Sequence, residues 1–193
     1  MAAGNKTNQE TELKIPCKDL DVVRNALREN NAREGFAGIE RNVVFDTADR
    51  RLFASDGLLR LRQYDKCTLT FKGPRGETSP VKTRSEFEAE VVDFARMEQV
   101  LYGLGYGRVW VYEKFREEWF VGDATVTLDR LPCIGCFVEV EAADEDAVLA
   151  VARRLGLDIS GATSKTYAEL FEEYLAERGE EFRDLVFEEK ESQ

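Results

Sequence analysis

The sequence predicts an α+β protein, in which helices pack against a large antiparallel sheet. Apolar and polar residues alternate with a period of two over eight short segments, which is the pattern of strands with one buried face. Most of these segments follow one another through short turns and do not alternate strictly with helices. This order favours antiparallel pairing over a doubly wound parallel sheet.

The first predicted strand covers residues 9–15, where Thr11, Leu13 and Ile15 alternate with two carboxylates and an amine. A second strand is predicted at 37–46. The other six strands are predicted at 57–64, 67–73, 84–92, 107–120, 123–129 and 136–142. Every second side chain along each strand is therefore expected on the same face of the sheet.

Helical periodicity appears in four further segments. It predicts helices at 18–30, 94–104, 144–155 and 163–177. Asp93 is the expected cap of the second helix, and Ser160 or Thr163 that of the last. Gly and Pro residues predict a loop at 73–80. We expect the acidic residues 179–193 to form a poorly ordered tail.

Composition argues against several classes of protein. The 193 residues have a net charge of -11, whereas a nonspecific nucleic-acid binder needs a basic surface. The sequence contains no run of about 18 apolar residues that would span a membrane. Residues 1–9 lack an apolar signal core. We therefore expect no nucleic-acid or membrane partner, and a cytoplasmic location.

The chain has four cysteines and no histidine. Cys133 and Cys136 have the spacing of a zinc half-site or a redox pair, but a tetrahedral zinc site needs two more ligands. Cys17 and Cys67 are far apart in the sequence, so reduced thiols are the simpler interpretation. The absence of histidine excludes Ser–His and Cys–His nucleophilic catalysis. Any acid–base or metal chemistry must use carboxylates, lysines, tyrosines or water.

The polar face of nearly every predicted strand carries full charges. Arg60 and Arg62 share a face, as do Glu139 and Glu141, and like charges this close repel unless an opposite charge lies between them. A sheet with one face in water would also show alternating apolar and polar residues. The water-facing side of such a sheet, however, favours Thr and Ser over Glu and Lys. We therefore expect the sheet to curl so that its charged faces meet inside and the helices cover the outside.

Two sets of charged residues would line this enclosed space. A basic set suits a multiply charged anion, because arginine pairs with phosphate oxygens and lysine adds a point charge. An acidic set suits Mg²⁺ or Mn²⁺, which bind carboxylates together with water and substrate phosphates. The two sets predict a metal-bridged polyphosphate site. The basic residues are Lys14, Arg60, Arg62, Lys72, Arg84, Lys114 and Arg116, and the acidic residues are Glu10, Glu12, Asp129, Glu139 and Glu141.

Seven motifs, in order, resemble those of the CYTH superfamily, the triphosphate tunnel metalloenzymes. They are ExExK at 10–14, FDTADRRLFASDGLLRLR at 45–62, TFKGP at 70–74, RSEFE at 84–88, KFR at 114–116, LDRLPCIGCFVEVE at 128–141 and SKTYAELF at 164–171. The resemblance covers residues 9–176. It implies an eight-stranded antiparallel barrel, or tunnel, with helices on the outside, in a domain spanning 9–178. Members of this superfamily are monomers or homodimers.

The resemblance also implies roles for single residues. The basic set would hold the phosphates, and Lys165 would close one end of the tunnel. The acidic set would bind one or two divalent ions or orient water, and Glu86 fits either role. The candidate catalytic residues are Glu12, Lys14, Glu86 and Arg116.

The implied reaction is metal-assisted phosphoryl transfer. We expect hydrolysis of tripolyphosphate, thiamine triphosphate or a nucleoside triphosphate. A class IV adenylate cyclase is an alternative, in which the ribose 3′-hydroxyl attacks and the products are cyclic AMP and pyrophosphate. A non-catalytic module that binds polyphosphate or nucleotide is a third interpretation, although binding alone would not require the acidic set.

Overall fold

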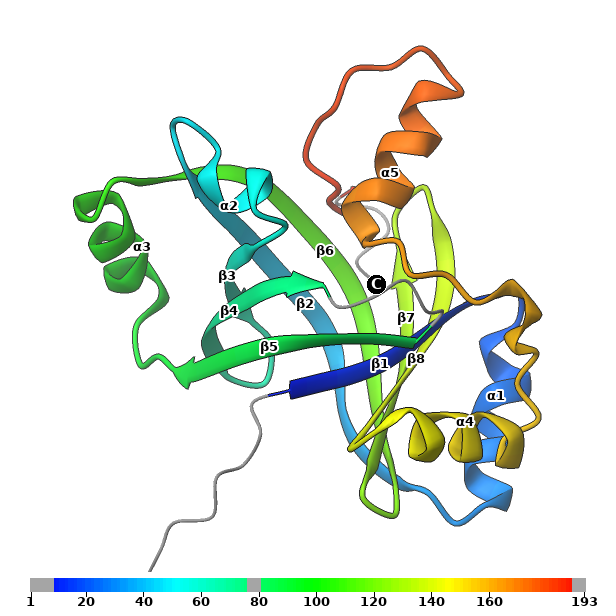
Figure 1. Cartoon of the computed structure of the whole chain (residues 1–193). Coiled ribbons are helices and arrows are strands. Elements are labelled where there is room, and N and C mark those ends of the chain that lie inside the picture. The colour runs from blue at the N-terminus through cyan, green and yellow to red at the C-terminus, as the bar shows by residue number, and fades with distance from the viewer. Residues whose placement is uncertain (1–8, 76–80, 189–193) are drawn as a thin grey trace, which may run out of the picture.

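The computed structural model describes the backbone of residues 9–75 and 81–188 and the side chains of residues 11–74 and 84–188. Within these ranges, eight antiparallel strands close into a barrel in the order β1-β5-β4-β3-β2-β6-β7-β8 (Figure 1). The strands are β1 (Gln9–Cys17), β2 (Arg33–Thr47), β3 (Leu58–Gln63), β4 (Cys67–Arg75), β5 (Val81–Glu90), β6 (Tyr106–Val121), β7 (Ala124–Leu131) and β8 (Gly135–Ala142). The predicted fold class and all eight predicted strands are confirmed.

β2 and β6 are longer than the sequence pattern predicts. They pair with each other from Arg33 opposite Phe120 to Thr47 opposite Tyr106, with two irregularities in register along the way. Bulges of this kind bend and twist a strand pair. The long pair therefore curves while each strand supplies hydrogen-bond partners for the other, and it forms the longest wall of the barrel.

The helices are α1 (Leu20–Glu29), α2 (Arg51–Ala54), α3 (Phe94–Gly103), α4 (Glu145–Arg154) and α5 (Tyr167–Ala176), with a 3₁₀ turn at Ile159–Gly161. All four predicted helices are present. Asp93 caps α3 as predicted, because its carboxylate accepts a hydrogen bond from the Arg96 backbone N–H at 3.0 Å. No helix of the described residues has the length and apolar character needed to cross a membrane.

The predicted start of the last helix is wrong. Neither Ser160 nor Thr163 caps α5; the cap is Thr166, which forms a capping box with Glu169. The Glu169 carboxylate accepts from the Thr166 backbone N–H at 2.6 Å, and the Thr166 hydroxyl accepts from the Glu169 N–H at 3.2 Å. Thr163 instead bridges β1, where its N–H donates to the Lys14 carbonyl at 2.9 Å. This bridge ties the approach to α5 to the barrel.

α2 is a single turn that the sequence pattern did not predict, because four residues are too few to show a period. Asp46 fixes it at the end of β2. Its carboxylate accepts backbone hydrogen bonds from Thr47 at 2.7 Å and from Leu52 and Phe53 at 3.0 Å. Burial would raise the pKa of Asp46, but these bonds to the ionised form outweigh burial and lower it.

Helices cover the outside of the barrel in two places. α1 and α4 lie side by side over β1, β7 and β8 (Figure 1), around Leu27, Val126 and Val148, which are fully buried. α3 covers β3 and β6, where Leu61 and Val111 are fully buried. The apolar faces of these strands therefore point outward to the helices, which leaves their polar faces on the inside.

α5 occupies a different position, at one end of the barrel. Its residues Tyr167, Phe171 and Leu175 pack with Trp110 and Tyr112 of β6. Trp110 and Tyr112 have the same strand parity as the charged residues further along β6, so this end of the barrel is filled by aromatic side chains. The apolar packing of α5 therefore closes part of the barrel opening.

Residues 179–188, hereafter the C-terminal segment, pack against β6. The Leu185 N–H donates to the Val111 carbonyl at 2.9 Å, and its carbonyl accepts from the Glu113 N–H at 2.8 Å. β7 pairs with β6 only from Phe115 onward, so this part of β6 presents an edge that the segment covers. Leu185 is fully buried. The expectation of poor order is therefore wrong for 179–188; residues 189–193 lie outside the described residues.

Candidate functional site

The inside of the barrel holds a cavity of about 1220 Å³. Charged side chains from the inward faces of the strands line it, so the prediction that these faces meet inside the barrel is confirmed. The basic residues that line the cavity include all seven predicted ones: Lys14, Arg60, Arg62, Lys72, Arg84, Lys114 and Arg116. The acidic residues of the strands in the same wall are Glu12, Asp46, Glu86, Glu88, Glu118, Glu139 and Glu141.

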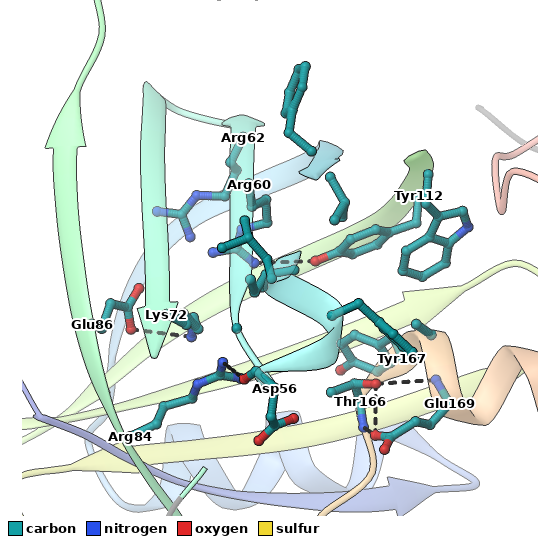
Figure 2. A pocket seen from close by; sticks show the side chains of 18 of the residues that line it. Asp56, Arg60, Arg62, Lys72, Arg84, Glu86, Tyr112, Thr166, Tyr167 and Glu169 are labelled. Atoms are coloured by element: carbon teal, nitrogen blue, oxygen red, sulfur yellow. Dashed lines mark hydrogen bonds and ion pairs between the residues drawn. The ribbon is translucent and has the colours of Figure 1, made fainter. Parts of the chain in front are cut away.

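Arg60 of β3 points into the cavity and is only 9% exposed. Its Nη1 donates to the Tyr112 hydroxyl of β6 at 3.2 Å (Figure 2). Its Nε has no hydrogen-bond partner among the described residues. Burial would lower the pKa of Arg60, but Tyr112 and the Glu40 carboxylate outweigh burial and raise it. A buried, charged guanidinium with an unused N–H favours an anionic ligand.

Two further cations are held in place by groups on the cavity wall (Figure 2). Lys72 of β4 lies directly opposite Glu86 of β5, with 3.2 Å between Lys72 Nζ and a Glu86 carboxylate oxygen. Arg84 donates from Nε to the Gly73 carbonyl at 2.8 Å and from Nη2 to the Asp56 carbonyl at 3.1 Å. The bonds to backbone carbonyls hold the Arg84 guanidinium in a fixed orientation without neutralising its charge.

Lys114 and Arg116 of β6 are bound to the fully buried Asp129 of β7. Asp129 accepts from Lys114 Nζ at 2.9 Å, from Arg116 Nε and Nη2 at 2.7 and 2.6 Å, and from the Tyr167 hydroxyl at 2.9 Å. Burial would lower the pKa of Arg116, but Asp129 and Glu40 outweigh it and raise that pKa well above its usual value. Burial and the Asp129 charge both raise the pKa of Tyr167, which therefore stays neutral and donates.

Glu40 of β2 is fully buried, and the sequence analysis did not select it. Its carboxylate oxygens lie 3.4 Å from Lys114, 3.7 Å from Arg116 and 3.9 Å from Arg62. Burial would raise the pKa of Glu40, but Lys114 and Arg116 outweigh burial and hold it well below its usual value. Glu40 and Asn42 have the same inward parity as the charged residues of the other strands. The alternation along the predicted strand 37–46 therefore already indicated that the Glu40 side chain faces the interior.

Carboxylates gather where β1 meets β8. Glu12 lies directly opposite Glu141, and Lys14 opposite Glu139. The register therefore gathers the Glu12 and Glu141 carboxylates on adjacent strands in the wall of the cavity. Among the described side chains, no group of three acidic or thiol residues is arranged to hold a metal ion. Mg²⁺ commonly uses one or two carboxylates plus substrate phosphates and water, and Glu12 with Glu141 fits that donor set.

A comparison with known protein families shows which family this chain belongs to. The sequence profile of the CYTH domain matches residues 8–167, which is most of the chain. The chain belongs to the CYTH family. The predicted resemblance is therefore confirmed.

Two related proteins align with this CYTH chain over most of their length. A protein of Methanocaldococcus jannaschii, provisionally named an adenylate cyclase, is 28% identical over 171 residues, which cover 83% of this chain and 97% of the relative. Adenylate cyclase CyaB of Aeromonas hydrophila is 27% identical over 179 residues, which cover 86% of this chain and 90% of the relative.

Solved structures support the CYTH fold. A Pyrococcus horikoshii protein has a TM-score of 0.71 at 28% identity, covering 85% of this chain and 98% of its own. A provisionally assigned adenylate cyclase of Vibrio parahaemolyticus has a TM-score of 0.75 at 24% identity, covering 84% and 97%. A Hippeastrum protein, provisionally named an adenylyl cyclase and showing a dominant triphosphatase activity, has a TM-score of 0.63 at 19% identity, covering 90% and 97%.

Two predicted site residues with described side chains, Asp129 and Lys165, do not line the cavity of the CYTH barrel. Asp129 lies behind the wall, with its carboxylate occupied by Lys114, Arg116 and Tyr167. The Lys165 Nζ donates to the exposed Glu173 at 2.6 and 2.8 Å, and the Lys165 backbone carbonyl accepts from Lys14 Nζ at 3.2 Å. The side chain of Glu10 lies outside the described residues, so its metal-binding role stays a prediction.

The four cysteines are free thiols. Cys17 of β1 lies opposite Cys136 of β8, and Cys133 is exposed in the β7–β8 turn. Burial raises the pKa of the Cys136 thiol, and the nearby Cys17 adds to this. A raised pKa keeps a thiol protonated and slows metal binding and exchange. The interpretation as reduced thiols agrees with this environment.

Proposed function

We propose that this CYTH protein is a divalent-metal-dependent enzyme that hydrolyses a triphosphate. One observation carries the proposal: seven cations from five different strands line a single internal cavity together with the carboxylates of β1 and β8. A buried cluster of this kind is electrostatically costly unless anions neutralise it. A triphosphate with a divalent ion supplies both the negative charge and a partner for the carboxylates. Tripolyphosphate, thiamine triphosphate and nucleoside triphosphates are the candidate substrates.

The cations divide into two groups by how they are held. Arg60 donates to the neutral Tyr112 hydroxyl and has an Nε with no hydrogen-bond partner among the described residues, which suits direct binding of a phosphate oxygen. Lys114 and Arg116 are bonded to Asp129, which orients them towards the cavity before substrate arrives. Such preorganisation stabilises charge that develops in the transition state without a cost of reorientation.

Lys14 and Arg116 meet at the Glu139 carboxylate. Lys14 Nζ lies 3.3 Å from one Glu139 oxygen, and Arg116 Nη2 lies 2.5 Å from the other. We assign to these two cations the stabilisation of the phosphoryl group that is transferred. Glu12 or Glu86 on the cavity wall then orients the attacking water, because each places a carboxylate beside the basic cluster.

We assign the divalent ion to Glu12 and Glu141, with Glu139 beside them. When bound, Mg²⁺ or Mn²⁺ would neutralise negative charge on the phosphates. The chain's own contribution is to hold these carboxylates on adjacent strands, where the register of β1 with β8 fixes Glu12 opposite Glu141. Asp129 belongs in a different role, as the counter-ion that holds Lys114 and Arg116.

Adenylate cyclase activity is the second candidate function. It is favoured by the names of the two relatives, from Methanocaldococcus jannaschii and Aeromonas hydrophila. The cyclase reaction uses the same phosphate and metal contacts, but the attacking group is the ribose 3′-hydroxyl of ATP and the leaving group is pyrophosphate. The fold does not separate the two reactions, so products must be measured.

One assay distinguishes these functions. The protein is incubated with ATP, thiamine triphosphate and tripolyphosphate in Mg²⁺ or Mn²⁺, and phosphate, pyrophosphate and cyclic AMP are resolved. Phosphate release supports the hydrolase. Cyclic AMP with an equal amount of pyrophosphate selects the cyclase. Binding without turnover of any of the three contradicts both and leaves a binding module.

The Glu12→Gln variant tests the metal assignment. We expect it to abolish metal-dependent turnover, because the amide removes one of the two opposed charges at the junction of β1 and β8. The matched control is Glu90→Gln, which changes an exposed residue of β5 paired with Lys66. Full activity of the Glu12 variant at the same metal concentration would contradict the assignment.

A further inference from the structure

Two cysteines on adjacent strands lie side by side on the outer face of the barrel. Cys17 is the last residue of β1, and it lies directly opposite Cys136 near the start of β8. The next pair of the same parity is Ile15 opposite Val138, and both of these side chains belong to the core beneath α1 and α4. The two thiols therefore lie at the edge of that core, and neither cysteine lines the cavity.

The position of this pair suits a disulfide. Residues directly opposite in antiparallel strands have Cβ atoms about 4.5–5.5 Å apart, and a disulfide joins Cβ atoms about 3.5–4.5 Å apart, so the two residues need to approach by about 1 Å. Both lie at the ends of their strands, where the hydrogen-bond ladder opens most readily, so the fold permits this approach. Each thiol is free and half-buried, and a small oxidant therefore reaches it without unfolding of the barrel.

The spacing in the sequence favours a different partner for Cys136, because Cys133 precedes it by three residues. Cys133 lies in the exposed turn between β7 and β8, where the Glu180 carboxylate and the Cys133 sulfur both raise the pKa of Arg183. This contact directs the Cys133 thiol towards the C-terminal segment. Cys136, in contrast, lies close to Cys17, and burial together with Cys17 raises the pKa of the Cys136 thiol. The contacts therefore favour Cys17 as the partner of Cys136.

We propose that Cys17 and Cys136 form a modification site, which hydrogen peroxide oxidises to an intramolecular disulfide. One thiol attacks the peroxide, so that an S–O bond forms, the O–O bond breaks and one water molecule leaves. The second thiol attacks the resulting sulfenic acid, so that the S–S bond forms, the S–O bond breaks and a second water molecule leaves. The two sulfur atoms together lose two electrons, which reduce the peroxide, and both thiol protons end in water. Without an oxidant of this class the two thiols stay reduced.

The disulfide joins two points that are distant in the sequence. The chain between Cys17 and Cys136 contains every element from α1 to β7. A cross-link that closes so long a loop restricts the unfolded chain strongly and stabilises the folded state. The link also lies three positions along each strand from Lys14 opposite Glu139, so it fastens β1 to β8 beside the charged pairs of the cavity wall. We therefore expect the oxidised protein to have a higher Tm than the reduced protein.

Peptide mapping of the full chain tests the proposal without requiring turnover. The reduced protein is treated with hydrogen peroxide, its remaining thiols are alkylated, and trypsin then releases Cys17 in residues 15–18 and Cys136 in residues 131–153. We expect mass spectrometry to find these two peptides joined, and dithiothreitol to separate them. The Tm of the oxidised protein should rise by about 5–10 °C.

Serine variants show which thiols react. Cys133→Ser is the matched control, because Cys133 lies on the same tryptic peptide as Cys136, and this variant should keep both the cross-link and the rise in Tm. Cys17→Ser should lose both, whereas Cys67→Ser should keep both. Absence of the joined peptides in the wild-type protein, loss of the cross-link in Cys133→Ser, or a cross-link between two copies of the chain on a non-reducing gel overturns the proposal.

Discussion

The Asp129→Asn substitution tests whether this buried carboxylate is a counter-ion or a metal ligand. Asp129 is fully buried and accepts hydrogen bonds from Lys114, Arg116 and Tyr167. The asparagine side chain has nearly the same shape, but it removes the negative charge and turns an N–H₂ group towards positively charged donors. The variant therefore isolates the loss of charge from any loss of volume.

The structure sets the expected magnitude. Removing one partner of a buried ion pair costs about 3–5 kcal/mol of unfolding free energy. Lys114 and Arg116 still have Glu40 at 3.4 and 3.7 Å, and Arg116 also has Glu139 at 2.5 Å. We therefore expect the lower end, about 3 kcal/mol, or a fall in Tm of roughly 6–12 °C for a chain of this size.

Urea denaturation of both proteins, with the Mg²⁺ dependence of activity measured alongside, checks this prediction. The counter-ion role predicts a large loss of stability with little change in the Mg²⁺ concentration that gives half-maximal activity. Tyr167→Phe is the control, because it removes only one hydrogen bond to Asp129 and should cost about 1 kcal/mol. A stable Asp129→Asn variant that requires far more Mg²⁺ would refute this reasoning and restore the metal-ligand role.

Three other predictions follow from named contacts. Glu40→Gln should destabilise the protein by about 3 kcal/mol near pH 7. Because the folded-state pKa of Glu40 lies below its unfolded value, this difference in unfolding free energy should be present above about pH 4.5 and shrink as the pH falls below it. A difference that stays constant down to pH 3 in urea denaturation would contradict the assignment. Arg60→Ala should lower kcat/KM for triphosphates about 10–100-fold in steady-state assays, because it removes a charge-assisted contact. The control Arg41→Ala removes an ion pair with Glu113 outside the cavity and should change kcat/KM less than threefold. Similar losses in the two variants would exclude a specific role for Arg60. Leu185→Ala should cost about 2–5 kcal/mol in chemical denaturation, since the side chain is fully buried, and an unchanged midpoint would show that the C-terminal segment is dispensable for stability.

The inward-facing residues were predictable because the direction of a strand side chain is a local property. Arg60 and Arg62 alternate with Leu59 and Leu61, so one pair must face the interior whatever the strand pairs with. Glu40 follows the same rule, because it shares the inward parity of Asn42 on the predicted strand 37–46. The order of the motifs predicted the family for the same reason, since both depend on the sequence alone.

Residue roles that depend on neighbours were not predictable in the same way. Asp129 has the inward parity of a cavity residue, but Lys114 and Arg116 on the adjacent strand bury it behind the wall. Lys165 precedes α5 as the motif requires, but its side chain turns outward to Glu173. Both outcomes depend on which side chains become neighbours when the strands pair and α5 packs on the barrel. The spacing of residues in the sequence does not predict these contacts.

The sequence by itself determined the number of strands, their inward faces and the collection of basic and acidic groups between them, because the two-residue period of a strand acts over a few residues. Only the tertiary structure decided which carboxylate lies against which cation, and that the C-terminal segment packs on β6 and adds Phe182 to the cavity wall beside Trp110. The physical reason is that closing the barrel sets the register of all eight strands together, and ionic contacts over 3–4 Å depend on that register.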